Sequence, residues 1–210
     1  MKLSIRSIRP TKIVCVGTNY GDHAKELGLK VPEEPLIFLK PPSSIIYDSQ
    51  EIVYPPGVTR LDYEAELAVV IKEAARNVRE EDVPAYILGY TCLNDVTARD
   101  LQNKDGQWTR SKSFDTFCPI GPEIETGIDP ADVKVESYLN GVLKQSSSTR
   151  HLIFTVRRLV CFISGVMTLL PGDIISTGTP HGVGPMQPGD TIEIRIEGIG
   201  GLKNKVARAR

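Results

Sequence analysis

Two glutamates placed two residues apart are the first side chains in this sequence that could do chemistry together. Glu64 and Glu66 open the segment 64–73, whose composition predicts a β-strand. Side chains alternate between the two faces of a strand, so both carboxylates point to the same side. The strand continues as a core-like run at 68–71, and two carboxylates beside a core repel each other unless a proton or a cation lies between them. A hard divalent cation would resolve this repulsion, whereas a pair on a solvated face would need none.

A third carboxylate, Asp95, follows a second predicted strand at residues 88–93. It stands where that strand passes into a predicted short helix at 98–103. Arg99 and Gln102 come four and seven residues after it, on the helical face that Asp95 shares. One interpretation is a metal ligand followed by two contacts to a substrate anion. The other is an ion pair on the surface.

Three further residues could serve as acid–base or charge-stabilising groups. His23 and Glu26 are three residues apart in a predicted short helix at 22–27, so they face the same way. A carboxylate beside an imidazole fixes the tautomer of the ring and raises its basicity, as in general-base pairs, although such pairs also occur on surfaces. Lys112 lies in a polar loop after Trp108, where a single lysine is ordinarily solvated.

The segment Thr177-Gly-Thr-Pro-His-Gly-Val-Gly184 follows a predicted strand and is rich in glycine and hydroxyl groups. Its free backbone amides and the hydroxyls of Thr177 and Thr179 could hold an anion. It lacks the Gly-Lys-Thr ending of a phosphate-binding P-loop, and a simple turn between strands is the alternative. His181 has no partner nearby in the sequence, so we expect it at the surface.

Strands are the main elements available to position these side chains. Short apolar runs between turn signals predict about ten strands. They cover 12–17, 36–40, 51–54, 64–73, 88–93, both arms of 134–144, 173–177, 191–197 and 202–207. Asn140-Gly141 predicts the turn of a hairpin, and apolar residues at spacings of three and four predict the best helix at 155–167. This pattern favours a mainly β single domain and does not decide between a barrel and a sandwich.

Length and composition narrow the class of protein. The 210 residues suit one domain, which we expect to span 1–210, and 25 Lys and Arg nearly balance 26 Asp and Glu. No basic excess therefore favours nucleic acid or an anionic membrane. The most apolar stretch, 159–170, has 12 residues, short of the roughly 20 that span a membrane. The four cysteines are widely spaced and no signal peptide is evident, so we expect a cytoplasmic protein.

Seven motifs stand in one order along nearly the whole chain. They are Gly17-x-Asn19-Tyr20-x-x-His23-x-x-Glu26, Phe38-x-Lys40-Pro41, Asp62-Tyr63-Glu64-x-Glu66-Leu67, Asn94-Asp95-Val96-Thr97-x-Arg99-Asp100, Lys112-Ser113-Phe114-Asp115, Leu170-Pro171-Gly172-Asp173 and Thr177-Gly178-Thr179-Pro180-x-Gly182-Val183-Gly184. In this combination the chain resembles the fumarylacetoacetate hydrolase family, in its branch of short acylpyruvate hydrolases and oxaloacetate decarboxylases.

The resemblance implies a mainly β fold with short helices (α+β), a twisted, mixed and barrel-like arrangement of strands, and a homodimer. It implies a Mg²⁺ or Mn²⁺ site made by Glu64, Glu66 and Asp95. A further acidic ligand of the longest relatives has no counterpart here, so water or substrate would fill the other positions, as Mg²⁺ permits. The match begins near the first residue, so we expect the amino-terminal domain of longer relatives to be absent.

The resemblance also implies a reaction and the residues that perform it. Lys112 would stabilise an oxyanion or enolate, and His23 and Glu26 would activate water from a lid that orders over the substrate. The residues implied to contact the substrate are Arg99, Gln102, Thr179 (at the carboxylate) and Lys40. The implied reaction is hydrolysis of a C–C bond in an acylpyruvate, a 2-oxo (1,3-dicarbonyl) acid, to pyruvate and a carboxylate.

Other functions use the same groups. Enolate stabilisation could decarboxylate oxaloacetate or interconvert its keto and enol forms, or it could serve an isomerase or decarboxylase of ring-opened aromatic catabolites of the 2-hydroxyhepta-2,4-diene-1,7-dioate type. A metal-binding scaffold is the non-enzyme alternative. The presence of His23, Glu26 and Lys112 argues against a scaffold.

Overall fold

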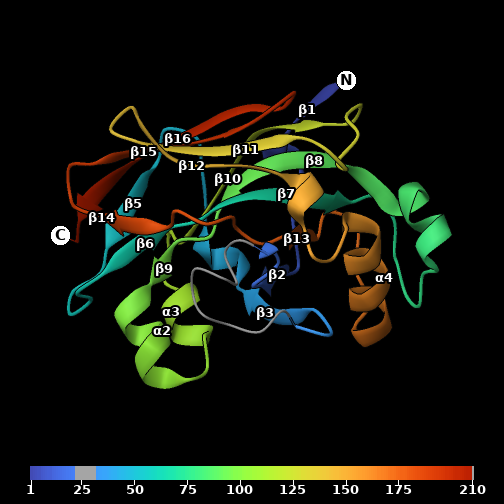
Figure 1. The fold of residues 1–210 in the computed structure, drawn as a ribbon, viewed down its shortest axis with the longest axis horizontal. Helices are drawn as coiled ribbons and strands as arrows, with labels where there is room; N and C mark the ends of the chain where they lie inside the picture. Colours follow the sequence, from blue (N-terminus) through green and yellow to red (C-terminus); the bar gives the residue numbers. More distant parts are fainter. Residues whose placement is uncertain (22–31, 210) are drawn as a thin grey trace.

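Strands dominate the computed structural model, which describes residues 1–21 and 32–209 (Figure 1). Strands make up 43% and helices 20% of the described residues, which confirms the expected mainly β fold with short helices. The largest sheet has eight strands. In pairing order they are β1 (Lys2–Ser4), β10 (Cys118–Glu125), β8 (Ile87–Asn94), β7 (Ala65–Ile71), β13 (Ile174–Ser176), β2 (Ile13–Gly17) and β3 (Leu36–Lys40), with β4 (Ile45–Tyr47) also paired to β10.

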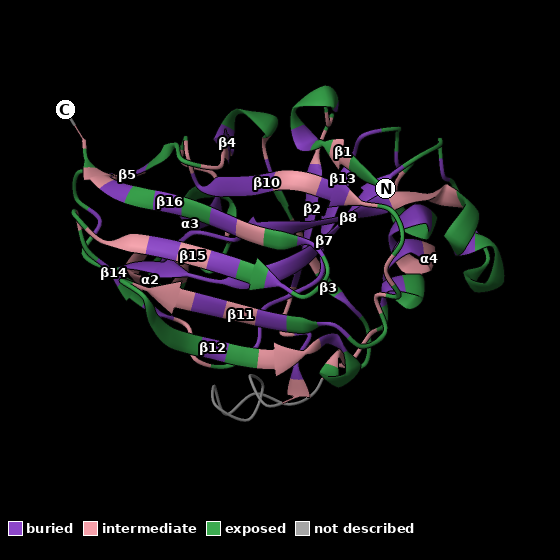
Figure 2. Ribbon diagram, turned by 90° about the horizontal axis from the view of Figure 1, so that it is seen from above, coloured by how far each residue is buried: buried purple, intermediate pink, exposed green. Residues whose placement is uncertain are grey.

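Two smaller sheets complete the described fold. One has five strands in the order β12 (Val142–Ser148), β11 (Lys134–Leu139), β15 (Thr191–Ile196), β16 (Gly200–Arg208) and β5 (Glu51–Tyr54). The other has three strands in the order β14 (Gly184–Met186), β6 (Leu61–Tyr63) and β9 (Thr97–Ala98). In Figure 2 strands β11, β12, β15 and β16 lie as a layer over the large sheet. Within the described residues no sheet closes on itself, so the strands form open layers and not a closed barrel.

Strand β7, predicted over 64–73, spans Ala65–Ile71, so Glu66 lies in the strand and Glu64 just before it, and the strand is buried along its whole length. Every residue of β7 is buried, because β8 and β13 flank it and both of its faces are covered. Leu67 and Val69 belong to the hydrophobic cluster on one face, and Ala68 and Val70 to a second cluster on the other. Strands covered on both faces have nearly continuous apolar sequences. Glu66 is therefore a carboxylate set into the interior of the protein.

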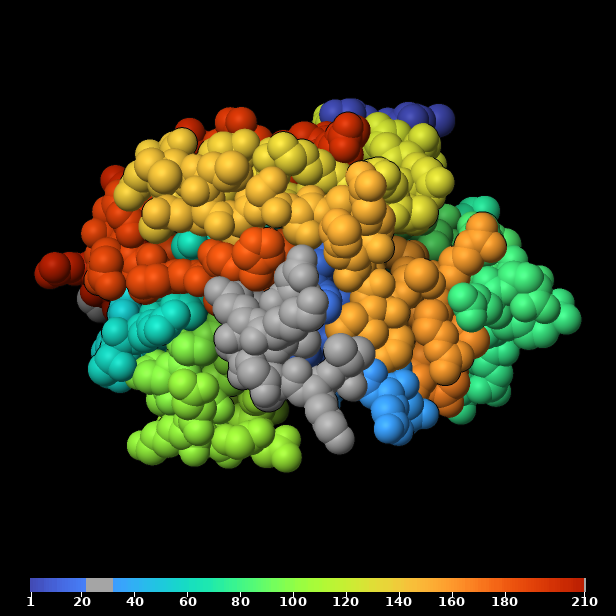
Figure 3. All heavy atoms as spheres, viewed as in Figure 1, coloured from blue at the N-terminus to red at the C-terminus, as the bar shows by residue number. Residues whose placement is uncertain are grey.

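The helices of the described residues are short and lie at the periphery. They are α2 (Arg99–Asp105), α3 (Thr109–Lys112) and α4 (Val156–Val166), with the 3₁₀-helices η1 (Ile5–Ser7), η2 (Pro42–Ser44), η3 (Glu80–Tyr86) and η4 (Thr149–His151). Helix α4 confirms the helix predicted at 155–167: the hydroxyl of Thr155 accepts a hydrogen bond from the Arg158 amide at 3.3 Å, and the apolar stripe is buried. In Figures 1 and 3, α2 and α3 lie at one side of the molecule and α4 at the other.

The hairpin turn was predicted correctly, because the Asn-Gly pair is specific for one backbone conformation. Asn140 and Gly141 have φ values of 52° and 79° between β11 and β12, the backbone that the Asn-Gly hairpin signal predicts. Six strands were not predicted. Five of them, β1, β4, β6, β9 and β14, have only two or three residues. The sixth, β10, contains Pro119 and Pro122, and proline is rare inside sheets.

Two expectations concern other parts of the chain. The short helix predicted at 22–27, with His23 and Glu26, lies outside the described residues. In the part of the chain that is described, no helix is long and apolar enough to span a membrane.

Candidate active site

A cavity of about 440 Å³ brings together most of the side chains that the sequence singled out. Seven of the ten predicted site residues line it: Glu64, Glu66, Asp95, Arg99, Gln102, Lys112 and Thr179. Lys40 lies behind this lining, and His23 and Glu26 lie outside the described residues. Most of the predicted site is thus assembled from segments that are far apart in the sequence.

Strand pairing places the three carboxylates next to one another. Ala65 of β7 pairs with Asn94 of β8, which sets Glu64 and Glu66 beside the end of β8, where Asp95 follows. The Asp95 amide donates to the Glu64 carbonyl at 2.9 Å, and the Asn94 side-chain oxygen accepts from the Glu64 amide at 2.9 Å. One carboxylate oxygen from each of the three acids lies within 4.8 Å of the others.

Two buried lysines partly balance this negative charge. The ammonium of Lys112 donates to Glu64 at 2.9 Å and to Asp95 at 2.6 Å. Lys40 donates to the other Asp95 oxygen at 2.5 Å and to the Val96 carbonyl at 3.1 Å. Burial would lower the pKa of Lys112, but Asp95 and Glu64 outweigh it and hold that pKa above the usual range. Lys112 therefore stays charged at neutral pH.

The two glutamates of the strand have different electrostatic surroundings. Burial would raise the pKa of Glu64, but Lys112 and Arg99 outweigh it and hold that pKa below its usual range. Glu66 accepts hydrogen bonds from the Ser176 hydroxyl and from the Gly178 amide, the latter at 2.7 Å. Burial and the carboxylates of Asp95 and Glu64 raise the pKa of Glu66 to about 8. Glu66 thus has hydrogen-bond donors but no cation in direct contact within the described residues.

The donor set fits a hard divalent cation. Three carboxylates converge, all of their donor atoms are oxygen, and no cationic side chain of the described residues contacts Glu66. Mg²⁺ and Mn²⁺ prefer carboxylate and water oxygens, and either would favour the ionised form of Glu66. The residues present therefore match the metal site expected from the sequence.

A second charged group forms the outer part of the cavity. Arg99, in the first turn of α2, donates to Glu64, to the oxygen of Gln102 and, at 2.9 Å, to Asp62. Arg60 also donates to Asp62, through its Nε at 2.9 Å. Buried Asp62 thus holds two guanidinium groups at the cavity. Neither Arg60 nor Asp62 was predicted as a site residue, although Asp62 lies within one of the seven motifs.

The glycine-rich loop 177–184 contributes one side of the cavity through Thr179. The Thr179 hydroxyl donates to the Ala65 carbonyl at 3.0 Å and accepts from the Gln145 amide at 2.8 Å. Gly178 has φ +99°, and a Cβ there would lie 2.7 Å from the Cβ of Asn19. The loop therefore approaches the site more closely than a residue with a side chain would permit. His181 is exposed, as expected.

Aromatic residues form the apolar part of the cavity, and sequence reasoning did not identify them as site residues. Phe38 and Trp108 line it and meet edge to face, with their ring centroids 5.1 Å apart. The Lys112 ammonium lies 5.0 Å from the centre of the Phe38 ring. A Cβ on Gly17 would lie 2.7 Å from the Trp108 ring. The only sign of this contact in the sequence is that the predicted strand at 12–17 ends in a glycine.

The chain is similar to known proteins along nearly its whole length. The model of the fumarylacetoacetate (FAA) hydrolase C-terminal family matches residues 12–207. An uncharacterised protein of Methanocaldococcus jannaschii is 58% identical, over 97% of this chain and 86% of that protein. A mitochondrial oxaloacetate tautomerase of Rattus norvegicus is 42% identical, over 94% of this chain and 67% of that protein.

Two solved structures have the same fold. The 5-carboxymethyl-2-hydroxymuconate delta-isomerase of Mycobacterium smegmatis superposes with a TM-score of 0.91 at 49% identity, covering 97% of this chain and 81% of the other. The 2-hydroxyhepta-2,4-diene-1,7-dioate isomerase of Mycobacterium marinum superposes with a TM-score of 0.90 at 48% identity, covering 96% and 76%. With a family match along nearly its whole length, the chain belongs to the fumarylacetoacetate hydrolase family, a family of enzymes.

Proposed function

We propose that this protein is a Mg²⁺- or Mn²⁺-dependent enzyme that interconverts the keto and enol forms of a 2-oxo dicarboxylic acid such as oxaloacetate. The observation that carries the proposal is the convergence of Glu64, Glu66 and Asp95 beside the charged Lys112 in one cavity. The names of the relatives, an oxaloacetate tautomerase and two isomerases, describe proton shifts of the same kind.

The three carboxylates would hold the cation. A divalent cation bound there supplies a Lewis acid and a template for the carboxylate and oxo oxygens of the substrate. Lys112 would stabilise the charge that develops on the oxo oxygen when the C3 proton leaves. An ammonium group has three donors, and Lys112 uses two of them on Glu64 and Asp95. The third is available to the enolate oxygen.

The charge of the cavity supports a dianionic substrate. Its described lining includes three cationic side chains, Arg60, Arg99 and Lys112, and three carboxylates. A divalent cation would therefore leave a net charge of +2, equal and opposite to the two carboxylates of oxaloacetate. Asp62 fixes the Nε of Arg60, so the terminal nitrogens of that guanidinium would be free to bind the distal carboxylate.

Lys40 fits a positioning role better than a contact with substrate. It is buried, does not line the cavity and donates to Asp95 and to the Val96 carbonyl. We propose that it fixes the carboxylate of Asp95 in the orientation that the cation needs.

The direct test follows the decay of oxaloacetate enol by its ultraviolet absorbance. We expect catalysis with Mg²⁺ or Mn²⁺ and none with a chelator. Lys112→Ala should lose about 10²–10³-fold in kcat, the usual effect of removing one oxyanion donor. Lys104→Ala, which removes an exposed lysine from α2, is the matched control. If the wild-type protein does not accelerate this decay with either metal, the proposal is wrong.

Acylpyruvate hydrolysis is the second candidate function. The observation that favours it is the pair His23 and Glu26, placed three residues apart like a general base and its orienting carboxylate. Hydrolysis would start from the same bound 2-oxo acid and add water at the distal carbonyl. Release of pyruvate from a panel of acylpyruvates, lost in His23→Ala while enol decay persists, would support it. Absence of pyruvate release by the wild-type protein would exclude it.

A further inference from the structure

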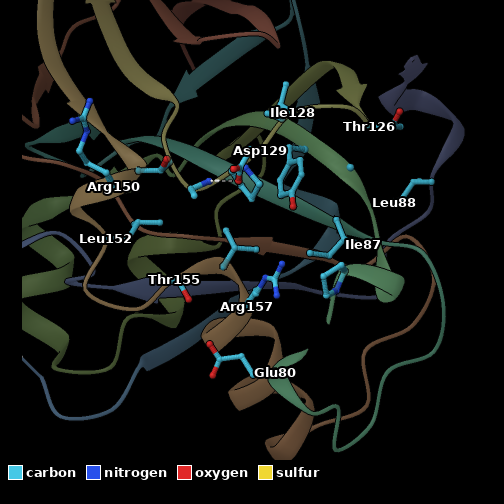
Figure 4. Close-up of a pocket in the computed structure, with 17 residues that line it drawn as sticks. Glu80, Ile87, Leu88, Thr126, Ile128, Asp129, Arg150, Leu152, Thr155 and Arg157 are labelled. Carbon is cyan, nitrogen blue, oxygen red and sulfur yellow. Dashed lines mark hydrogen bonds between the residues drawn. The ribbon is translucent and has the colours of Figure 1, made fainter. Parts of the chain in front are cut away.

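A second cavity, of about 580 Å³, lies apart from the catalytic cavity and shares no lining residue with it (Figure 4). Four segments enclose it: η3, the first half of β8, the loop that follows β10, and the chain from η4 into α4. Its volume lies within the range of small-molecule sites. No part of the proposed reaction uses it.

Tyr90 gives this cavity an unused polar group. The residue is only 8% exposed and lines the cavity. Its hydroxyl makes no hydrogen bond with any described residue, and the hydroxyl oxygen is not among the fully buried atoms that lack a partner, so it is open to the cavity. Burial raises the pKa of Tyr90 to about 12, so the hydroxyl keeps its proton at neutral pH. It is therefore a donor that faces the cavity without a partner.

The amino-terminal end of α4 makes one side of the cavity positive. Its first turn contains Arg157 and Arg158 and no acidic residue. Cations are unfavourable at this end of a helix, where the first backbone N–H groups already carry partial positive charge. Arg157 lines the cavity, and its guanidinium forms no ion pair within the described residues. A bound anion would satisfy both the guanidinium and the free amides of the turn.

The remaining lining limits the kind of anion. Ile87, Leu88, Ile128, Leu152 and Val156 give the cavity an apolar wall. In Figure 4 Asp129 lies on the side opposite Arg157, and Glu80 also borders the cavity. These two carboxylates would repel a second negative charge, and the other arginine of the lining, Arg150, already pairs with Asp132 at 3.1 Å. A ligand with one anionic end and an apolar body matches the whole surface.

We propose that this cavity binds a small monocarboxylate with an apolar body, its carboxylate held by Arg157, the Tyr90 hydroxyl and the first turn of α4, and its body against the apolar wall. The site is separate from the catalytic cavity and does not depend on the proposed reaction. The Tyr90 hydroxyl donates to the ligand carboxylate, and the apolar wall excludes water from this contact.

Calorimetric titration of benzoate into the full chain tests this proposal, with benzyl alcohol and acetate as probes that lack the charge or the body. We expect benzoate to bind more tightly than either. Arg157→Gln and Tyr90→Phe should each weaken benzoate binding about tenfold or more, consistent with the loss of one hydrogen bond to a charged group. Arg158→Gln is the matched control. It removes the same charge from the same turn, but Arg158 does not line the cavity. It should bind benzoate as the wild-type protein does.

Three results would overturn the proposal. The first is equal benzoate affinity in Arg157→Gln and Arg158→Gln, which would mean that only general charge matters. The second is benzoate binding that is lost in Lys112→Ala and kept in Arg157→Gln, which would place the ligand in the catalytic cavity. The third combines two observations: the wild-type protein does not bind benzoate, and Arg157→Gln has a lower molecular mass in solution than the wild-type protein. That result would assign the cavity to a contact between copies of the chain.

Discussion

At the scale of single residues, the site depends on the different charge balance of two glutamates on one side of a strand. Glu64 contacts Lys112 and Arg99, and its pKa lies below the usual range. Glu66 is equally buried but receives only neutral donors, from Ser176 and the Gly178 amide. Both positions hold a glutamate, and both side chains point to the same side. The difference between their pKa values therefore comes from the groups that other elements place beside them.

The raised pKa of Glu66 predicts a pH dependence of stability in the metal-free protein. Its value rises from 4.5 to about 8 on folding, so the folded state binds a proton that the unfolded state has lost between these pH values. The free energy of unfolding should therefore fall as pH rises from about 4.5 to 8 and then level off. In Glu66→Gln this component of the fall should be absent. At pH 9 with a chelator the variant should be more stable than wild type by at least about 1.4 kcal/mol, the equivalent of one pKa unit.

Urea unfolding at several pH values measures this difference, with the exposed Glu73→Gln as control. Other groups titrate in all three proteins, so the difference between wild type and Glu66→Gln isolates Glu66. Parallel stability profiles for these two proteins would contradict the assigned charge state.

The pair of arginines on Asp62 predicts substrate selectivity. Arg60→Gln removes the guanidinium that we propose for the distal carboxylate. The KM for oxaloacetate should rise about tenfold or more, since a hydrogen bond between charged groups contributes roughly 1.5–3 kcal/mol. Proton exchange at C3 of pyruvate, which has no distal carboxylate, should change little. Arg110→Gln, at an exposed arginine outside the cavity, should leave both unchanged. Equal losses for the two substrates would refute this role.

At the scale of elements, the register between paired strands brings most of the site residues together. Pairing of Ala65 with Asn94 sets Glu66 of β7, and Glu64 just before it, beside the end of β8, and β13 leads into the loop whose Gly178 amide holds Glu66. Because strand side chains alternate, a shift of one residue in either pairing would turn the carboxylates to the other face. The site is thus a product of the sheet and not of any one segment.

The loop after β13 gives a prediction at this scale. Gly178→Ala would introduce a Cβ 2.7 Å from Asn19, at φ +99°, and would displace the amide that donates to Glu66. Gly189 has a similar φ of +103°, but a Cβ added there would meet no other atom within 4 Å. Gly189→Ala should therefore cost only the backbone strain, about 1 kcal/mol. Gly178→Ala should cost about 1–3 kcal/mol more, as over-packed positions do, and should also weaken catalysis.

Thermal or urea unfolding of both alanine variants, together with the enol-decay assay, checks this expectation. If the two variants lost equal stability and both kept full activity, close packing of the loop against Asn19 would have no part in holding Glu66.

The sequence could predict those parts of the site that depend on local spacing. Two glutamates on one strand face, and an acid at the end of the next strand, follow from side-chain alternation alone. The partners of Lys112 could not be predicted from local pattern, because Glu64 and Asp95 are 48 and 17 residues away. Its polar loop suggested a solvated lysine, whereas the structure buries it.

The same reason explains which parts of the fold were missed. The long strands and α4 have clear periodicity, but two- and three-residue strands such as β9 and β14 exist only because a neighbour pairs with them. The ion pair of Asp62 with Arg99 likewise depends on β6 lying next to β9. Tertiary contacts of this kind leave no signal in a short window of sequence.

At the scale of the whole molecule, two exposed sheet edges support the proposed homodimer. Strand β3 ends the large sheet and exposes Leu36 and Leu39 by 49% and 46%. Strand β12 ends the five-stranded sheet and exposes Val142 and Leu143 by 57% and 48%. Unpaired edges with apolar side chains favour association unless they are covered.

We therefore predict a symmetric homodimer. Light scattering at micromolar concentration should give about 46 kDa, twice the 23.1 kDa of the chain. Leu39→Lys and Leu143→Lys, made separately, should each be tested, since a charge on the edge that forms the contact should shift the mass toward the monomer. A mass near 23 kDa for the wild-type protein would refute the dimer.

The measurement that tests the metal-dependent site most directly is the calorimetric titration of Mn²⁺ into the wild-type protein, Glu66→Gln and the exposed control Glu73→Gln at pH 7. Because the pKa of Glu66 is raised to about 8, binding to the wild-type protein should release close to one proton, seen as a dependence of the heat on the buffer. Glu66→Gln should bind Mn²⁺ more than about 100-fold more weakly, beyond the loss from a residue that only supports a ligand, and Glu73→Gln should match wild type. Unchanged Mn²⁺ affinity in Glu66→Gln would contradict the metal site and, with it, the proposed reaction.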